Sequence, residues 1–258
     1  MGEARTGHSP VVEDILKIIW SAQERGEDGV AVNEVAARMG VVPSTASENV
    51  ARLTEQGLID HKPYRKAHLT AEGRRVAIGI VRRHRLLETY LHEALGFDWD
   101  EVHEEAEALE HAVSDRLLER LDRVLGHPSR DPHGDPIPRP DGSVADEAGV
   151  LLPLVGEGAG CVVARVSDRD PQALREFDAA GLVPGAALTV VRKEGSAVVV
   201  ALGGAPAVHL GAPVLPAARQ SEALPCRPVD HRGQRVRDRR ADDRCPRHRQ
   251  HFPSCEAQ

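Results

Sequence analysis

Apolar residues in the first part of the chain recur with the spacing of one face of an α-helix. The first run contains Val12, Ile15, Leu16 and Ile19, at positions i, i+3, i+4 and i+7. Two shorter helices are predicted after it, in NEVAARMG, which Gly40 ends, and in VVPSTASENVARLTEQG, which Pro43 opens. Two short helices joined by a tight turn that contains glycine predict a helix-turn-helix.

The next segment, LIDHKPYRKAHLT, alternates apolar and polar residues around a basic tip. Such a pattern predicts a two-stranded hairpin, and a hairpin at this place is the wing of a winged helix. Helical spacing resumes from about Ala71 to Ala94. It returns from about Asp100 to Leu125 after a break at GFDW.

The second part of the chain has a different pattern. Residues 126–149 contain five prolines among Gly, Asp and Ser, which favours an extended linker. The short runs CVVARV, ALTVVRK and SAVVVAL, separated by Gly and Pro, predict a small antiparallel barrel with one inserted helix in QALREFDAAG. Residues 219–258 hold ten Arg and six acidic residues but few large apolar side chains, and this composition predicts disorder.

The composition of the chain excludes several classes of function. A length of 258 residues predicts more than one domain, and the net charge of −7 restricts any nucleic-acid contact to a local basic patch. Aromatic residues make up only 3%, too few for a platform that stacks single-stranded bases. No apolar run approaches the roughly 18 residues of a membrane helix, and the start lacks the apolar core of a signal peptide. We therefore expect a cytoplasmic protein without a membrane partner.

Small polar side chains gather at the start of the second helix of the predicted pair. These are Ser44, Thr45, Ser47 and Glu48, which can meet base edges in a major groove. Arg52, Arg65 and Lys66 can neutralise the flanking phosphates. The alternative is a winged helix that makes only protein contacts.

Histidines and carboxylates recur at helical spacing in the two long helical segments. His84 and Glu88 lie at i and i+4 on one helix, and the next segment carries His103, Glu107, Glu110 and His111. Imidazoles and carboxylates that converge between facing helices can hold divalent transition metals, and two groups predict two sites. The alternative for any single residue is a solvated helix face, which we expect for Glu104, Glu105, Glu119 and Asp122.

The order of these elements resembles a known family. Over about residues 10–217 the chain contains, in order, a winged helix, RRHRLLE, VHEEAEALEHAVSDRL, RDPHGDPIP and a small β-barrel. This series resembles the diphtheria-toxin-repressor family of metal-dependent regulators, in particular its manganese-responsive branch. The resemblance implies a mainly α fold with a C-terminal β module. Its parts would be a winged helix-turn-helix DNA-binding domain (1–72), a helical metal-binding and dimerisation domain (73–140), a linker (141–150), an SH3-like, FeoA-like β-barrel (151–217) and the tail (218–258).

The same resemblance implies two metal sites. The primary site would consist of Asp14, Glu107, Glu110 and His111, and the secondary site of His84, Glu88 and His103, completed by Asp168. The iron-responsive branch carries a thioether and a thiol at the positions of Asp14 and Glu107, so the carboxylates here favour Mn²⁺, with Fe²⁺ as the alternative. Two-domain manganese regulators have a further Glu where this chain has Lys17, which argues against a closely spaced binuclear site.

The resemblance implies a manganese-dependent transcriptional repressor of metal-uptake genes. We expect it to bind pseudo-palindromic double-stranded operator DNA as a homodimer, because residues 100–125 carry an apolar stripe of Val102, Leu109, Val113, Leu117, Leu121 and Val124. The alternatives are an iron-responsive repressor, a dinuclear metallohydrolase and a metal carrier. No nucleophile motif or phosphate loop supports an enzyme or a small organic substrate. A zinc site at Cys245, His248, His251 and Cys255 would need apolar support that the tail lacks.

Overall fold

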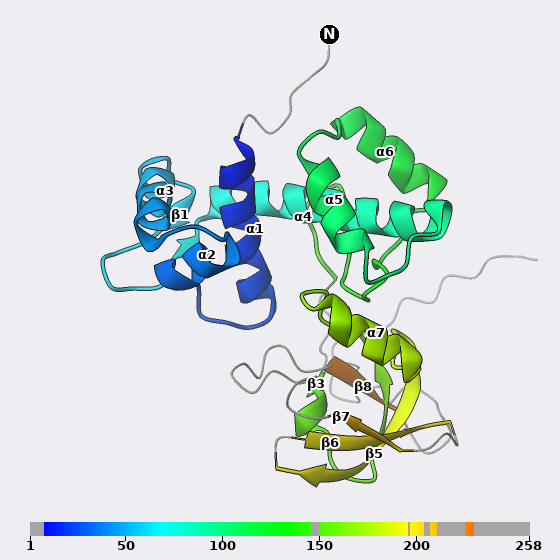
Figure 1. Cartoon of the computed structure of the whole chain (residues 1–258). Coiled ribbons are helices and arrows are strands. Elements are labelled where there is room, and N and C mark those ends of the chain that lie inside the picture. Colours follow the sequence, from blue (N-terminus) through cyan, green and yellow to red (C-terminus); the bar gives the residue numbers. More distant parts are fainter. Residues whose placement is uncertain (1–7, 146–149, 196, 204–206, 211–224, 230–258) are drawn as a thin grey trace, which may run out of the picture.

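The computed structural model describes residues 8–145, 150–195, 197–203, 207–210 and 225–229 (Figure 1). The first part contains α1 (Pro10–Glu24), α2 (Val32–Arg38) and α3 (Pro43–Glu55), followed by a hairpin of β1 (Ile59–Asp60) and β2 (His68–Leu69). The two strands are antiparallel, and Ile59 pairs with Leu69. The predicted helix-turn-helix and wing are therefore both present.

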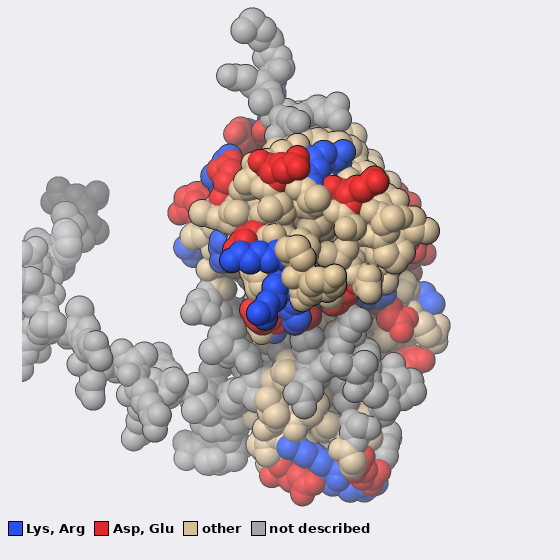
Figure 2. Space-filling model, turned by 90° about the vertical axis from the view of Figure 1, so that its left-hand side faces the viewer, with Lys and Arg blue, Asp and Glu red and all other residues tan. Residues whose placement is uncertain are grey.

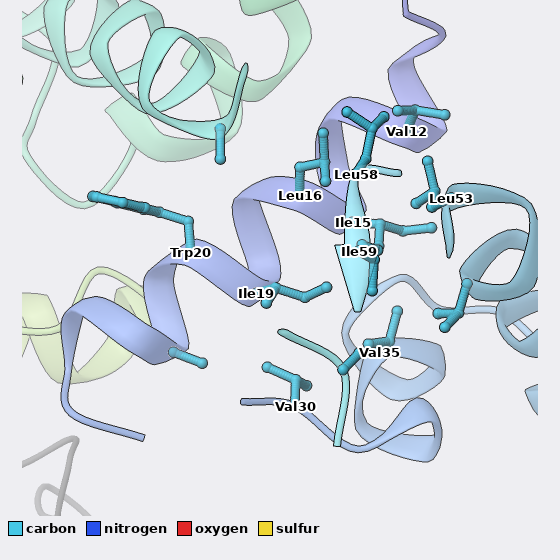
Figure 3. Packing of buried hydrophobic residues seen from close by; sticks show 14 of the residues in the cluster. Val12, Ile15, Leu16, Ile19, Trp20, Val30, Val35, Leu53, Leu58 and Ile59 are labelled. Atoms are coloured by element: carbon cyan, nitrogen blue, oxygen red, sulfur yellow. The ribbon is translucent and has the colours of Figure 1, made fainter. Parts of the chain in front are cut away.

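The core of this first part is aliphatic. Figure 3 shows the apolar face of α1 directed towards α2, α3 and β1, with Val12, Ile15, Leu16 and Ile19 at its centre. Each large aliphatic side chain buried there contributes about 1.5–3 kcal/mol to folding. The stripe read from the sequence is therefore what fixes α1 against the helix-turn-helix.

A long helix connects the first part to the rest. α4 (Ala71–Leu95) begins at Thr70, whose hydroxyl accepts a hydrogen bond from the Gly73 amide (3.0 Å) and donates one to the carbonyl of Gly57 (2.7 Å). A side chain at Gly73 would collide with the Leu58 carbonyl, so glycine allows the helix to start against the hairpin. α4 ends at Gly96, which adopts φ 74°.

The prediction of one continuous helix from Asp100 to Leu125 is wrong. The structure has α5 (Val102–Glu110) and α6 (Asp115–Val124), and both lie beside α4 (Figure 1). Ser114 is the reason for the break, because its hydroxyl accepts a hydrogen bond from the Leu117 amide and so caps a new helix.

The segment after residue 126, which we expected to be an extended linker, packs against the rest of the protein. It is extended, but Asp131, His133, Asp135 and Ile137 are buried. Arg85 of α4 donates a hydrogen bond to the carbonyl of Pro136 (2.7 Å), which holds the segment against the helix. Proline-rich composition thus predicted its conformation and not its burial.

The C-terminal part is a sheet of six antiparallel strands in the order β3-β8-β4-β5-β6-β7. The strands are β3 (Val150–Leu151), β4 (Gly160–Val163), β5 (Ala187–Glu194), β6 (Ala197–Leu202), β7 (Val208–Leu210) and β8 (Pro225–Val229), with a short helix η1 (Leu152–Leu154) and α7 (Pro171–Ala179). Within the described residues the outer strands β3 and β7 do not pair with each other, so the barrel is open there.

Strand β8 corrects the prediction of a disordered tail. Residues 225–229 pair with both β3 and β4, although they lie within the range 218–258 that composition assigned to disorder. The strand was not predicted because it contains Pro225 and Pro228, and proline is unusual inside a sheet. Cys245, His248, His251 and Cys255, whose spacing resembles a zinc site, lie outside the described residues. Among the helices that are described, none has the length and apolar character needed to cross a membrane.

Candidate metal centres and nucleic-acid interface

Three of the four residues predicted for the primary site come together. Asp14 projects from α1, Glu110 lies at the end of α5 and His111 follows it, and one ligand atom from each lies within 4.8 Å of the others. Nε2 of His111 is 3.2 Å from Oδ1 of Asp14 and 3.7 Å from Oε1 of Glu110. We call these three residues, with Glu107, the primary cluster.

The fourth residue, Glu107, is arranged differently. Its Oε1 accepts a hydrogen bond from Nζ of Lys17 at 2.6 Å, and the same ammonium group donates to Oε1 of Glu110 at 2.6 Å. Glu107 and Glu110 also form a second potential ligand group, together with His84. Burial acts to lower the pKa of Lys17, but Glu110 and Glu107 outweigh that effect and raise the pKa, so the ammonium group stays charged.

One residue that sequence reasoning missed orients the primary cluster. Oε2 of Glu13 lies 2.7 Å from Nδ1 of His111, and the Glu13 side chain is buried. A carboxylate on one ring nitrogen fixes the ring so that the other nitrogen can bind a metal. The sequence does carry a signal, because Glu13 is spaced i, i+3 and i+7 with Leu16 and Trp20 on the buried face of α1.

The donor set of the primary cluster fits a divalent metal ion. Oδ1 of Asp14 is buried and has no hydrogen-bond partner among the described residues. Burial raises the pKa of Asp14, which indicates that its charge lacks full compensation in the protein alone. A buried oxygen without a hydrogen bond, beside a carboxylate and an oriented imidazole, is what a metal ligand requires.

All four residues predicted for the secondary site lie together, and we call them the secondary cluster. Oε1 of Glu88 is 2.9 Å from Nε2 of His84 and 3.2 Å from Nδ1 of His103. Oδ2 of Asp168, from the segment between β4 and α7, is 3.2 Å from Nδ1 of His103. The C-terminal part of the chain therefore supplies one member of this cluster.

Protons balance the charge of the secondary cluster. Burial disfavours charged imidazoles, but Glu88 raises the pKa of His84 to about 9, and Asp168 and Glu88 raise that of His103 to about 11. Burial likewise works against charged carboxylates, but the same histidines hold the pKa of Glu88 and of Asp168 well below the usual range. Without a metal the cluster therefore contains two imidazolium–carboxylate pairs.

The two clusters contact each other through His84, and a third group of potential ligands includes Glu88 of the secondary cluster. Nδ1 of His84 is 2.6 Å from Oε2 of Glu110, so His84 touches both clusters. Glu88 is also grouped with Asp131 and His133, which sequence analysis had assigned to the linker region. Nδ1 of His133 is buried without a hydrogen bond among the described residues, while its Nε2 lies 2.7 Å from the carbonyl oxygen of Trp99.

The residues predicted to contact DNA lie on the surface of the winged helix. On α3, Ala46, Val50 and Leu53 are buried, whereas the exposed side is formed by Ser44, Thr45, Ser47, Glu48 and Arg52. Arg65 and Lys66 are exposed at the tip of the wing. Figure 2 shows that Lys and Arg side chains gather in a local patch on this side of a mostly uncharged surface.

The apolar stripe predicted for dimerisation divides into two sets. Val102 and Leu121 are buried within the subunit, and Val113 is half-buried. The exposed set on α5 and α6 consists of Leu109, Leu117 and Val124, of which Val124 is 74% exposed. These three side chains are the part of the predicted stripe that stays available to a second copy of the chain.

Three family descriptions match the chain in order. Residues 8–67 match the N-terminal DNA-binding domain of iron-dependent repressors, residues 70–139 their metal-binding and dimerisation domain, and residues 150–214 the FeoA domain. These domains make operator DNA and a second copy of the chain its partners. The fold class predicted from the sequence is confirmed.

Individual relatives agree with the domain matches. The iron-dependent repressor IdeR of Mycobacterium leprae is 31% identical over 204 residues, which cover 74% of this chain and 88% of that protein. The diphtheria toxin repressor of Corynebacterium glutamicum is 32% identical over 201 residues, covering 72% and 86%. A solved manganese-dependent transcriptional repressor in complex with manganese is 46% identical with a TM-score of 0.78, and the match covers 84% of this chain and all of that one. This chain therefore belongs to the iron-dependent repressor family, the family of the diphtheria toxin repressor, whose members are metal-dependent DNA-binding transcriptional repressors and not enzymes.

Proposed function

We propose that this protein is a manganese-dependent repressor of genes for metal-ion uptake, and that it binds pseudo-palindromic operator DNA in the cytoplasm. The observation that carries the proposal is the donor set of the primary cluster, where carboxylates of Asp14 and Glu110 face the imidazole of His111. Oxygen donors with one imidazole suit manganese, whereas thiolates and thioethers suit softer metals. The likeness to a manganese-bound repressor supports the same metal.

Iron is the second candidate for the activating metal. The IdeR proteins of Mycobacterium leprae and Mycobacterium tuberculosis, 31–32% identical to this chain, are named as iron-dependent. Iron also stands above manganese in the general order of affinity for nitrogen and oxygen ligands. Discrimination against iron would therefore have to come from the geometry and number of ligands.

The positions of the proposed ligands explain how metal binding could control DNA binding. Asp14 lies on α1, which packs in the winged helix, whereas Glu110 and His111 lie at the end of α5. A bound divalent ion supplies a cross-link between these donors. Glu13 keeps the His111 ring turned towards Asp14. Fixing α1 against α5 sets the spacing of the two α3 helices in a dimer, and only one spacing matches successive major grooves.

For the DNA surface we propose two roles. Ser44, Thr45, Ser47 and Glu48 would read base edges, and Arg52, Arg65 and Lys66 would bind phosphates. Lys66→Ala should weaken binding to every sequence and reduce the slope of log affinity against log salt by about one unit. Ser44→Ala should instead change the sequence preference. Lys193→Ala, on the exposed side of β5, is the matched control and should leave both quantities unchanged.

The test of the function is a metal-titrated DNA-binding assay. A binding site is first selected from a random DNA pool with manganese present, and its half-sites should be related by two-fold symmetry. Anisotropy titrations then compare Mn²⁺ with Fe²⁺ under anaerobic conditions. We expect Mn²⁺ to raise the affinity by at least about tenfold, or about 1.4 kcal/mol. A stronger response to Fe²⁺ would favour the second candidate, and binding without any metal would refute both.

The choice of metal can be tested through the ligands themselves. The double variant Asp14→Met, Glu107→Cys replaces two oxygen donors by sulfur donors and should shift the response towards iron, cobalt or nickel. An unchanged ranking of metals in this variant would remove Asp14 and Glu107 from the site.

A further inference from the structure

Lys17 lies among the residues of the primary cluster. It follows Asp14 by three positions on α1, and its side chain is only 12% exposed. Its Nζ is 2.6 Å from Oε1 of Glu107 and 2.6 Å from Oε1 of Glu110. These two distances and the burial distinguish it from an ordinary surface ion pair, which stabilises a protein little.

The potential ligands around Lys17 form two groups that share one carboxylate. Glu110 belongs with Asp14 and His111 in the first group and with His84 and Glu107 in the second. A shared carboxylate between two such groups has the form of a site for two cations. The ammonium group of Lys17 already binds two of the three members of the second group.

The charge of the cluster explains why a cation is needed there. Glu110 is fully buried, and the neighbouring carboxylates of Asp14 and Glu107 would repel it across a few ångströms. Like charges at this separation repel each other more strongly in a buried site than in water. A lysine attached to α1 offsets part of this repulsion permanently, whereas a dissociable ion does so only when it is bound.

We infer that Lys17 is a tethered cation that takes the place of a second metal ion, so that the primary cluster binds one divalent ion and not two. The inference rests on the proposed function, because it assumes that the Asp14, Glu110 and His111 group binds metal. In this arrangement Oε1 of Glu107 is the partner of Lys17, and only the other oxygen of this carboxylate remains for the one bound ion. Lys17 thereby determines the number of ions and weakens the affinity of the site for the one ion that binds.

Three substitutions separate the charge of Lys17 from its size. Lys17→Glu replaces the ammonium group by a further carboxylate, Lys17→Met removes the charge with little change in length, and Lys17→Arg keeps the charge as the matched control. Bound Mn²⁺ per subunit is measured by equilibrium dialysis and elemental analysis. Electron paramagnetic resonance shows whether two bound ions are close enough for their spins to couple.

We expect Lys17→Glu to bind one more Mn²⁺ per subunit than the unaltered protein, with a spin-coupled signal that the unaltered protein and Lys17→Arg lack. Lys17→Met should bind its first Mn²⁺ about tenfold more tightly, because a competing positive charge is removed. This affinity decides the question if Lys17→Glu does not fold. The spin-coupling measurement is made in a His103→Ala background, which removes the adjoining secondary site. A coupled pair of ions with Lys17 present in that background, or unchanged binding in both Lys17→Glu and Lys17→Met, would overturn the inference.

The same data distinguish failure of this inference from failure of the proposed function. His111→Ala should lose one bound Mn²⁺ relative to the unaltered protein. If it loses none, the primary cluster is not a metal site and the proposed function fails with the inference. If it loses one while the Lys17 variants behave like the unaltered protein, the function stands and only the role of Lys17 is refuted.

Discussion

The primary and secondary clusters use similar residues but neutralise their carboxylates in different ways. Both are partly or fully buried, and both combine carboxylates with imidazoles. In the primary cluster the positive charge is Lys17, which is held by the chain. In the secondary cluster it is carried by protons on His84 and His103. A metal ion entering the first must compete with a fixed cation, whereas one entering the second displaces protons.

The two clusters also connect different parts of the molecule. The primary cluster joins α1 to the end of α5, and so joins the winged helix to the dimerisation domain. The secondary cluster joins α4 and α5 to Asp168 of the C-terminal part, and Asp168 lies 3.8 Å from Arg25 just after α1. Metal at the first site should therefore control DNA binding directly, whereas metal at the second should mainly stabilise the arrangement around it.

Removal of Glu110 should have the largest effect, because this residue belongs to the primary cluster and touches His84 of the secondary cluster. Glu110→Gln should abolish the response of operator binding to every metal, and so lose the whole gain of about tenfold or more that Mn²⁺ gives the unaltered protein. It also removes one of the two carboxylate partners of Lys17 and of His84, which keep Glu107 and Glu88 respectively. Anisotropy titration measures the response, and Glu105→Gln, an exposed carboxylate on α5, is the control. A retained manganese response in Glu110→Gln would remove Glu110 from the ligands that control DNA binding.

Substitution of Glu13 should have the next largest effect and should be confined to the primary cluster. Glu13→Gln keeps the shape but weakens the contact that orients the His111 ring, so the affinity for one Mn²⁺ should fall by about 10–100-fold. Equilibrium dialysis measures this affinity. If His111→Ala and the double variant Glu13→Gln, His111→Ala bind Mn²⁺ differently, Glu13 has a role that does not pass through the imidazole.

A smaller effect on DNA binding is expected from the secondary cluster. Asp168→Asn should cost one bound Mn²⁺ per subunit, yet it should lower operator affinity by less than about tenfold, because no secondary ligand lies on α1. Asp178→Asn, exposed on α7, is the control. Complete loss of operator binding in Asp168→Asn would place control of DNA binding at the secondary cluster and reverse the comparison.

The residues of the two clusters could be predicted from the sequence to different degrees. His84 with Glu88, and Glu107 with Glu110 and His111, were found from helical spacing alone, because i+3 and i+4 neighbours share a helix face. Asp14 and Asp168 were predicted as ligands only from the family resemblance. Spacing could not supply Glu13 or the contacts of Lys17, since their partners lie 90 or more residues away, on α5 or directly after it. Only the packing of both α1 and α5 against α4 brings them together.

The other features that the sequence did not predict lie in segments without a regular pattern of apolar and polar residues. Asp131 and His133 lie in a proline-rich segment without periodicity, so nothing in the pattern showed that Arg85 holds that segment against α4. Strand β8 is stabilised by main-chain hydrogen bonds to β3 and β4, and its prolines and arginine lack the alternation that marks a strand. Buried irregular segments depend on long-range contacts, which local composition does not record.

The pH should affect operator binding least of all, because it acts through the protons of the secondary cluster. The pKa values of His84 and His103, about 9 and about 11, lie above the ordinary value of 6.5, so both imidazoles are protonated near neutral pH in the metal-free protein. Their contribution to folding stability is complete below pH 6.5 and is lost as the pH rises through these values. Metal binding needs unprotonated imidazole nitrogens, so Mn²⁺ affinity at the secondary cluster should rise with pH, by up to about tenfold per pH unit for each proton released.

The primary cluster should depend less on pH, because Lys17 is not a ligand and need not lose its proton. His111→Ala leaves only the secondary cluster, and His103→Ala leaves the primary cluster intact. Calorimetric titrations of both variants with Mn²⁺ between pH 6.5 and 8.0, in buffers of different ionisation enthalpy, count the protons released. We expect the steeper pH dependence and the greater proton release in His111→Ala. Equal slopes in the two variants would mean that the clusters do not differ in how their carboxylates are neutralised.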